Sequence, residues 1–267
     1  MRERKIVLTN EWQEVSKQWG HPLHAMCSYM GMFPQRLPHY FIEKFTRPGD
    51  VVLDPFSGRG TTPLQACVDG RVGIGVDLNP LAYILTKAKV QVPPLKHLEA
   101  RLRELENDMF FGDPSGEADR IQMLFHPKTL GQLVYLKHEL DLEDPCDTFI
   151  AATILGIMHG ASSRDQTRSS YLSISMPNTF SMSPNYIQKY VREKGLKQIP
   201  VDVFTALRRK FHRMYSYEPP PVEGYAFAER VDRLTKIANP HIRRREVQLV
   251  VSSPPYLRVV RYGLYNW

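Results

Sequence analysis

Two short polar segments, each directly after an apolar run, contain the residue types that could perform chemistry in this chain. Residues 54–62 read Asp-Pro-Phe-Ser-Gly-Arg-Gly-Thr-Thr, and residues 253–256 read Ser-Pro-Pro-Tyr. The first segment combines an acidic side chain with a glycine-rich turn, which lets the backbone approach a ligand closely. The second places a hydroxyl group beside two prolines, whose rings hold the backbone extended. The first segment is therefore suited to binding a ligand and the second to orienting a reacting group.

The first segment predicts a nucleotide-like ligand without a phosphate group. It matches neither GxGxxG nor GxxxxGK[ST], because no lysine follows its second glycine. Asp54 could face a cationic group, and Phe56 offers a flat apolar contact. Gly58 and Gly60 would let the backbone approach the ligand closely. Asp77 ends the next apolar run, where acidic residues bind ribose hydroxyls in dinucleotide folds. S-adenosylmethionine combines a ribose, a base and a positive centre, and it is the cofactor that we expect.

Several segments resemble the motifs of the amino-group DNA methyltransferases. Residues 54–62 are similar to motif I of that family, written DPF-x-G-x-G-T-T, and residues 48–53 match its lead-in. Residues 75–79, Gly-Val-Asp-Leu-Asn, resemble motif II, and residues 33–45 resemble the segment that closes over the methionine end of the cofactor. Residues 253–256 resemble motif IV, [SDN]-P-P-[YF]. The resemblance implies S-adenosylmethionine as methyl donor and double-stranded DNA as substrate.

The residue roles that we expect follow from these motifs. The cofactor-binding residues are Asp54, Pro55, Phe56, Gly58, Gly60, Thr61, Thr62 and Asp77, with Asp232 added from a segment that resembles motif III. For Asp232 a solvated charged turn is the alternative. The catalytic residues are Ser253, Pro254, Pro255 and Tyr256.

The second segment suits methyl transfer to an exocyclic amine of a base. Positive charge grows on the amine nitrogen during the attack, so the site needs acceptors aimed at it. The Ser253 hydroxyl and the Pro254 carbonyl can accept, and Tyr256 can stack on a flipped-out base. In this family serine at the first position is associated with N4 of cytosine and aspartate with N6 of adenine. We therefore expect methylation of cytosine N4, with adenine N6 as the alternative.

Neither a cysteine nucleophile nor a metal is expected. Transfer to an amine needs no covalent intermediate, unlike methylation of carbon 5 of cytosine. Cys146 lies in an acidic segment that we expect to be a loop, and we interpret it as structural. The three cysteines are widely spaced and form no CxxC pair, which argues against a disulfide framework and a zinc site.

The order of the expected strands and helices predicts an α/β fold with a helical insertion. The resemblance implies that its sheet is the Rossmann-like sheet of a methyltransferase. Strands are expected at residues 5–8, 51–53, 73–77, 225–228 and 247–251. Helices are expected at residues 38–45, 62–68, 79–90, 95–109, 128–140, 148–159, 186–194 and 201–215. We expect residues 1–90 to form the cofactor-binding part of the methyltransferase domain, residues 91–224 a helical insertion and candidate target-recognition region, and residues 225–267 the return to that domain with the catalytic loop.

The charge of the chain favours a polyanionic partner. Its formal net charge is +7 and its pI about 9.3. A basic protein of this kind suits a nucleic-acid partner. The alternative is a basic soluble enzyme that binds no polyanion. The residues expected to neutralise DNA phosphates are Arg208, Arg209, Lys210, Arg243, Arg244 and Arg245; a solvated helix face is the alternative for each run. No apolar run reaches the roughly 18–20 residues that span a bilayer, and the start, Met-Arg-Glu-Arg-Lys, lacks the apolar core of a secretion signal. We expect a cytoplasmic protein.

Few residues follow Tyr256, whereas the fold of the resembled family continues with further strands. We therefore expect a sheet that is incomplete at the C-terminus, in a truncated chain or in one completed by a second polypeptide. Such a chain would bind cofactor better than it catalyses. A non-catalytic cofactor- or DNA-binding subunit is the alternative of a different class, and methylation of RNA or of a protein glutamine ranks lower.

Overall fold

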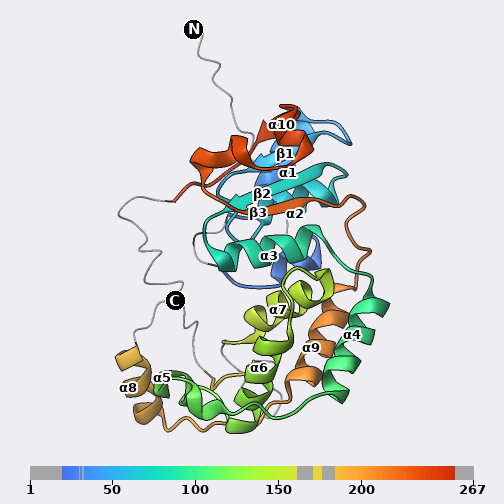
Figure 1. Cartoon of the computed structure of the whole chain (residues 1–267). Coiled ribbons are helices and arrows are strands. Elements are labelled where there is room, and N and C mark those ends of the chain that lie inside the picture. The colour runs from blue at the N-terminus through green and yellow to red at the C-terminus, as the bar shows by residue number, and fades with distance from the viewer. Residues whose placement is uncertain (1–19, 30, 32, 161–170, 176–183, 256–267) are drawn as a thin grey trace.

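The computed structural model describes residues 20–29, 31, 33–160, 171–175 and 184–255 (Figure 1). The expected strand at residues 5–8 and the expected catalytic Tyr256 lie outside the described residues.

The described strands form one parallel sheet with the order β3-β2-β1-β4. They are β1 (Val51–Asp54), β2 (Val72–Asp77), β3 (Tyr225–Ala228) and β4 (Val247–Val250). This confirms the α/β class, and it confirms the strands expected from the apolar runs after residue 50. Because all four strands run in the same direction, the residues that follow them gather at one edge of the sheet. β1 lies between β2 and β4, although almost 200 residues separate it from β4 in sequence.

Helices cover one face of the sheet. Ile42 of α1 (Arg36–Phe45) and Ala66 of α2 (Thr61–Val68) pack against Val52 and Leu249 of the strands. A Cβ atom at Gly73 would lie 2.1 Å from the carbonyl oxygen of Pro63, so this position of β2 must be glycine for α2 to approach so closely.

The opposite face carries the alternate side chains of the same strands. Val51, Leu53, Ile74 and Val76 form a second apolar cluster with Ile237. This face is covered by the 3₁₀ helix η6 (Val231–Lys236) and the short helix α10 (Pro240–Arg243).

Two helix starts show how local sequence sets the elements. α3 (Pro80–Val90) begins one residue later than expected, because Asn79 is its N-cap and accepts the amide of Leu81. The expected loop around Cys146 is wrong. α7 (Pro145–Ile157) begins there because Asp144 accepts the amides of Cys146 and Asp147, and proline is favoured at the first helical position.

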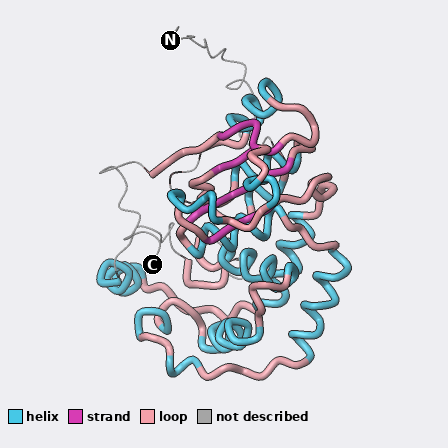
Figure 2. The backbone as a smooth tube through the Cα atoms, turned by 45° about the horizontal axis from the view of Figure 1, so that its top comes forward, coloured by secondary structure: helices cyan, strands magenta, loops and turns pink. Residues whose placement is uncertain are grey.

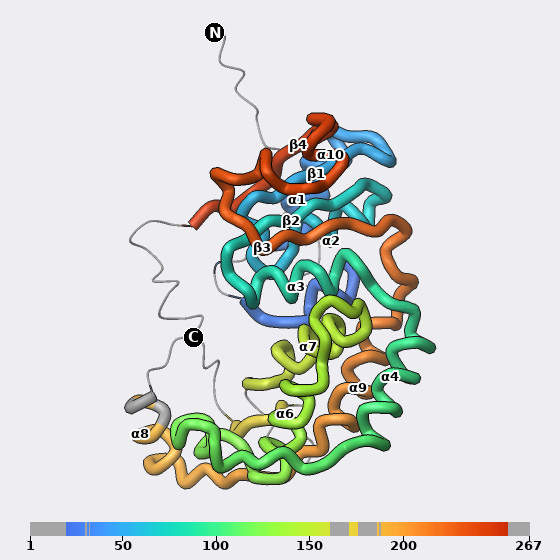
Figure 3. The backbone as a smooth tube through the Cα atoms, in the orientation of Figure 1, coloured from blue at the N-terminus to red at the C-terminus, as the bar shows by residue number. Residues whose placement is uncertain are grey.

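The chain between α3 and β3 forms a mainly helical part (Figure 2), and α7 of this part lies beside α3 (Figure 3). Its elements are α4 (Leu95–Asn107), η3 (Pro114–Gly116), α5 (Asp119–Gln122), α6 (Pro127–Glu139), α7, α8 (Pro184–Lys194) and α9 (Val203–Met214). Leu85 of α3 shares one apolar core with Leu98, Phe149 and Phe211 of these helices. The helical part is therefore joined to the sheet layer by a continuous core. Among the described residues, no helix is long and apolar enough to cross a membrane.

Candidate active site

The carboxyl edge of the sheet brings the two polar segments together. Beyond β4, the amide of Val251 donates to the carbonyl oxygen of Leu53 at 3.2 Å. The Ser252 hydroxyl then donates to Oδ1 of Asp54 at 2.6 Å. The first residue of the glycine-rich segment is thus in direct contact with the residue that precedes Ser253.

Asp54 is a buried acid whose ionisation depends on its neighbours. Its side chain is only 1% exposed, and Oδ1 also accepts the amide of Phe56 at 3.1 Å. Burial raises the pKa of Asp54 to about 6, while the hydrogen bonds from Ser252 and Phe56 oppose that rise. The carboxylate therefore gains charge in the pH range just below neutrality, and a nearby cation would favour the charged form.

The glycine-rich turn is folded against β2 and α3. Gly58 and Gly60 have φ angles of 50° and 79°, in the left-handed region that favours glycine. A Cβ atom at Gly60 would lie 2.9 Å from Oγ1 of Thr86. The amide of Gly58 donates to Oδ2 of Asp77 at 2.9 Å. The turn is therefore fixed by the same acid that was expected to bind the ribose.

Asp77 still has acceptor capacity for a ligand. Its Oδ1 accepts the amide of Asn79 at 2.9 Å, and its Oδ2 accepts that of Gly58. A carboxylate has about four acceptor positions, so ribose hydroxyls could bind to the half-buried group as well. Leu78, which follows it, is 67% exposed, so its side chain could contact a base. The motif comparison did not single out Leu78, although an apolar residue directly after a strand-ending acid was a visible signal.

The other expected cofactor residues fall into two groups. Pro55 and Phe56 are partly exposed at the edge and could contact a ligand. Thr61 and Thr62 are buried in the first turn of α2, where Thr61 accepts Nε of Arg59 at 3.4 Å. The two threonines therefore support the turn from within.

Asp232 lies in η6, after β3, and is exposed. Its carboxylate pairs with the guanidinium of Arg230 at 3.0 Å, and this hydrogen bond lowers the pKa of Asp232. The structure thus places Asp232 after β3, the strand beside β2, and its carboxylate is paired with Arg230.

The structure describes the expected catalytic segment as far as Pro255. Ser253 is partly buried, whereas Pro254 and Pro255 are exposed. The exposed prolines leave their part of the edge accessible to a substrate.

Two buried cations support the glycine-rich turn, and sequence reasoning missed both roles. Nζ of Lys89, which is fully buried in α3, donates to the carbonyl oxygen of Arg59 at 2.6 Å. Nη1 of Arg59 donates to the carbonyl oxygen of Cys27 at 3.2 Å. Burial, together with the charge of Arg59, lowers the pKa of Lys89 to about 7. The arginine between the two glycines was a signal, but the lysine sits 30 residues away in a helix.

The two basic runs expected to bind DNA lie apart. Arg208 pairs with Glu106, Lys210 donates to the carbonyl oxygen of Ala25 at 3.0 Å, and Arg209 is exposed. The exposed residues 243–245 lie at the end of α10, on the far side of α3 from α9 (Figure 1). The structure therefore does not join the two runs into one basic surface.

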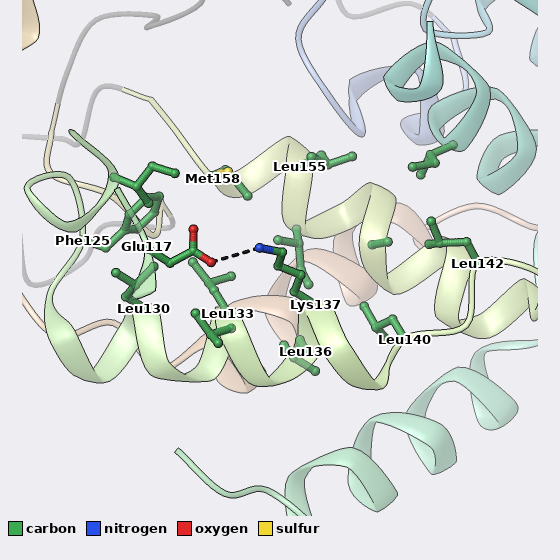
Figure 4. Close-up of a pocket in the computed structure, with 15 residues that line it drawn as sticks. Glu117, Phe125, Leu130, Leu133, Leu136, Lys137, Leu140, Leu142, Leu155 and Met158 are labelled. Carbon is green, nitrogen blue, oxygen red and sulfur yellow. Dashed lines mark hydrogen bonds and ion pairs between the residues drawn. The ribbon is translucent and has the colours of Figure 1, made fainter. Parts of the chain in front are cut away.

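A hollow of about 420 Å³ lies in the helical part, between α6 and α7 (Figure 4). Its lining is apolar except for Glu117 and Lys137, which pair with each other at 3.0 Å. The Glu117 carboxylate of this lining is held by Lys137, so the hollow suits an apolar group better than a reacting amine.

Among the described residues, His39, Glu43 and Asp69 form a group close enough to hold a metal ion. His39 bonds Asp69 at 2.9 Å and Glu43 pairs with Arg71. These side chains therefore have protein partners, and the expectation of no metal stays a prediction.

A parallel sheet with acids at the ends of adjacent strands and a glycine-rich turn between them is characteristic of a Rossmann-like fold. Residues 2–87 match the family model described as DNA methylase (N6_N4_Mtase). The chain is 23% identical to the type II methyltransferase M.MvaI of Kocuria varians, over 94% of this chain and 57% of that protein. It is 32% identical to the type II methyltransferase M.MjaII of Methanocaldococcus jannaschii, over 32% of this chain and 16% of that protein.

A third relative is the type II methyltransferase M.PvuII of Proteus hauseri, which is 39% identical over 24% of this chain and 20% of that protein. The alignments thus span little more than half of M.MvaI and much less of the other two. No solved structure matches the chain. The family model and the relatives confirm the resemblance to the amino-group DNA methyltransferases.

Proposed function

We propose that this chain transfers a methyl group from S-adenosylmethionine to N4 of cytosine in double-stranded DNA, as part of a restriction-modification system. The observation that carries the proposal is the 2.6 Å contact between Asp54 and Ser252, because it joins the expected cofactor segment to the expected catalytic segment. The family and the names of the relatives support the DNA methyltransferase class. A cytoplasmic location and a second polypeptide as partner remain predictions.

The residues at the sheet edge fit this cofactor. Asp77 has acceptor capacity for ribose hydroxyls, and the exposed Leu78 and the partly exposed Phe56 offer apolar contacts to the adenine. The carboxylate of Asp54, where burial raises the pKa to about 6, favours a cationic ligand over an anionic one. S-adenosylmethionine supplies an activated methyl group when bound.

The catalytic segment would act on the target amine. The Ser253 hydroxyl and the Pro254 carbonyl oxygen accept its hydrogen bonds and stabilise the charge that develops on the nitrogen. Two successive prolines keep this backbone extended, so the acceptors are oriented before the substrate arrives. Tyr256 would stack on the flipped base.

Serine at position 253 supports cytosine N4 as the target, by the association found in the family. Adenine N6 is the alternative, since both amines need the same acceptors. We further propose that residues 1–90 and 225–267 form the methyltransferase domain, and that residues 91–224 include the region that recognises the target sequence.

The test is methyl transfer from labelled S-adenosylmethionine to unmethylated DNA, followed by mass analysis of the nucleosides. The purified chain is expected to produce N4-methylcytosine, and Ser253→Ala is expected to lose most of this product while still binding cofactor. N6-methyladenine as the product would replace the proposed target. Cofactor binding without any methyl transfer would favour a non-catalytic subunit.

A further inference from the structure

We propose that Ser252 is a positioning residue, which couples the catalytic segment to the cofactor segment through the side chain of Asp54. The inference rests on the proposed function and deepens it, because no motif comparison assigns a role to Ser252. The residue lies immediately before the expected catalytic Ser253.

The end of β4 is attached to β1 at successive points. β1 and β4 pair in register at Leu53 and Val250 after a shift near Val51, where Gln248 is the extra residue on β4. At this bulge, Oε1 of Gln248 accepts a hydrogen bond from the backbone amide of Val51 at 3.1 Å. An inserted residue changes the face on which later side chains lie. The bulge therefore helps to decide that Ser252, and not a neighbour, meets Asp54.

A single oxygen of Asp54 serves both segments. Oδ1 accepts the Ser252 hydroxyl at 2.6 Å and the Phe56 amide at 3.1 Å. A distance of 2.6 Å is typical of a charge-assisted O–H···O⁻ bond, which is stronger than a neutral one. The hydrogen bond of its side chain restrains the backbone of Ser252. Because the two prolines after Ser253 have restricted φ angles, this restraint also orients the Ser253 hydroxyl and the Pro254 carbonyl group.

The environment of Asp54 makes this link sensitive to ionisation. Among the described residues, Asp77 is the charged group that acts on it, and it raises the pKa of Asp54 further. The Thr62 hydroxyl of α2 faces the same carboxyl group but makes no hydrogen bond of good geometry. Ser252 is thus the residue before Ser253 whose hydroxyl donates to the Asp54 carboxylate. Removing this hydroxyl should favour the protonated form of Asp54.

The experiment compares three variants: Ser252→Ala, Ser252→Thr, which keeps the hydroxyl, and Ser216→Ala at an exposed serine just after α9. Carbon-13 NMR of labelled aspartate follows the titration of Asp54, and it does not depend on methyl transfer. Ser252→Ala is expected to raise the pKa of Asp54 above the wild-type value. Ser252→Thr should restore that value and Ser216→Ala should leave it unchanged.

Kinetics provide the second readout. Ser252→Ala should lower kcat at least about ten-fold, as expected for a lost hydrogen bond to a charged group, with a smaller change in the KM for cofactor. The acid limb of its kcat profile should move to higher pH, and Ser252→Thr should recover most of the rate. A role limited to stability would lower the rate without moving that limb.

The outcomes separate this inference from the proposed function. Methyl transfer by the wild-type chain with no change in Asp54 titration, or with no recovery in Ser252→Thr, overturns the coupling while the function stands. A shifted Asp54 pKa in a chain that transfers no methyl group leaves the link in place and removes the proposed function.

Discussion

Replacement of the buried Lys89 by methionine tests how the glycine-rich turn is supported. The folded chain holds the pKa of this lysine at about 7, against an ordinary value of 10.5, chiefly because the side chain is fully buried. The cations Arg59 and Lys210 and the thiol of Cys27 are the charged or titratable groups that act on it. Burial also raises the pKa of Cys27, so its thiol stays neutral near pH 7 and supplies no counter-charge.

The magnitude follows from linkage between ionisation and folding. Above pH 10.5 the lysine is neutral in both states and contributes no penalty. As the pH falls from 10.5 to about 7, the unfolded chain binds a proton that the folded chain does not, so the free energy of unfolding decreases. Each pH unit is worth about 1.4 kcal/mol. Between pH 9.5 and pH 7.5 the loss is therefore about 2.5 kcal/mol, and it ends below the folded pKa.

Methionine has no charge to desolvate and is similar in length to lysine, so this loss should disappear in Lys89→Met. The substitution also removes the 2.6 Å hydrogen bond to the carbonyl oxygen of Arg59, which costs about 1 kcal/mol at every pH. The difference in free energy of unfolding between the variant and the wild type should therefore grow in favour of the variant by about 2.5 kcal/mol from pH 9.5 to pH 7.5.

Urea denaturation at several pH values, followed by circular dichroism, measures this difference. Lys96→Met, at an exposed position of α4, is the control and should show the pH dependence of the wild type. A difference between Lys89→Met and the wild type that stays constant from pH 7.5 to pH 9.5 would refute the reasoning, since Lys89 would then titrate alike in the folded and unfolded states.

Three further substitutions test other parts of the edge and surface. Asp77→Ala should raise the dissociation constant for S-adenosylmethionine about ten-fold or more in calorimetry, because it removes a charged acceptor; unchanged affinity would place the ribose elsewhere. Gly60→Ala should lower the free energy of unfolding by about 1–3 kcal/mol in urea denaturation, because the φ angle of Gly60 is 79° and the new methyl group would meet Thr86. An unchanged urea midpoint would show that the turn accepts a side chain at this position. Arg209→Ala should reduce the slope of log Kd for DNA against log salt by about one in fluorescence anisotropy, while an unchanged slope would mean that this exposed side chain contacts no phosphate.

The strands and most helices could be predicted because their signals are local. β1 and β2 are apolar runs that end in an acid. β3 and β4 are short runs rich in aromatic or β-branched residues, which also favour a strand. A helix was expected from residue 148, but its start at Pro145 was missed because the acidic segment around Cys146 was interpreted as a loop, whereas Asp144 caps the helix.

The site was predictable only in part, because its remaining contacts depend on the order and register of the strands. Asp54 and Asp77 follow from the motif, but the contact of Asp54 with Ser252 requires β4 to lie beside β1 with the bulge at Gln248. The support from Lys89 requires α3 to pack behind the turn. No local pattern in a single sequence specifies such long-range pairs.

The central claim, that this chain methylates the exocyclic amine of cytosine in DNA, is tested most directly by one measurement. DNA without modification is incubated with the purified chain and labelled S-adenosylmethionine, digested to nucleosides and analysed by mass spectrometry. The account predicts labelled N4-methylcytosine with the wild-type chain and little or none with Ser253→Ala. Equal amounts of labelled product with both proteins, or no labelled nucleoside from a folded wild-type chain that binds the cofactor, would contradict it.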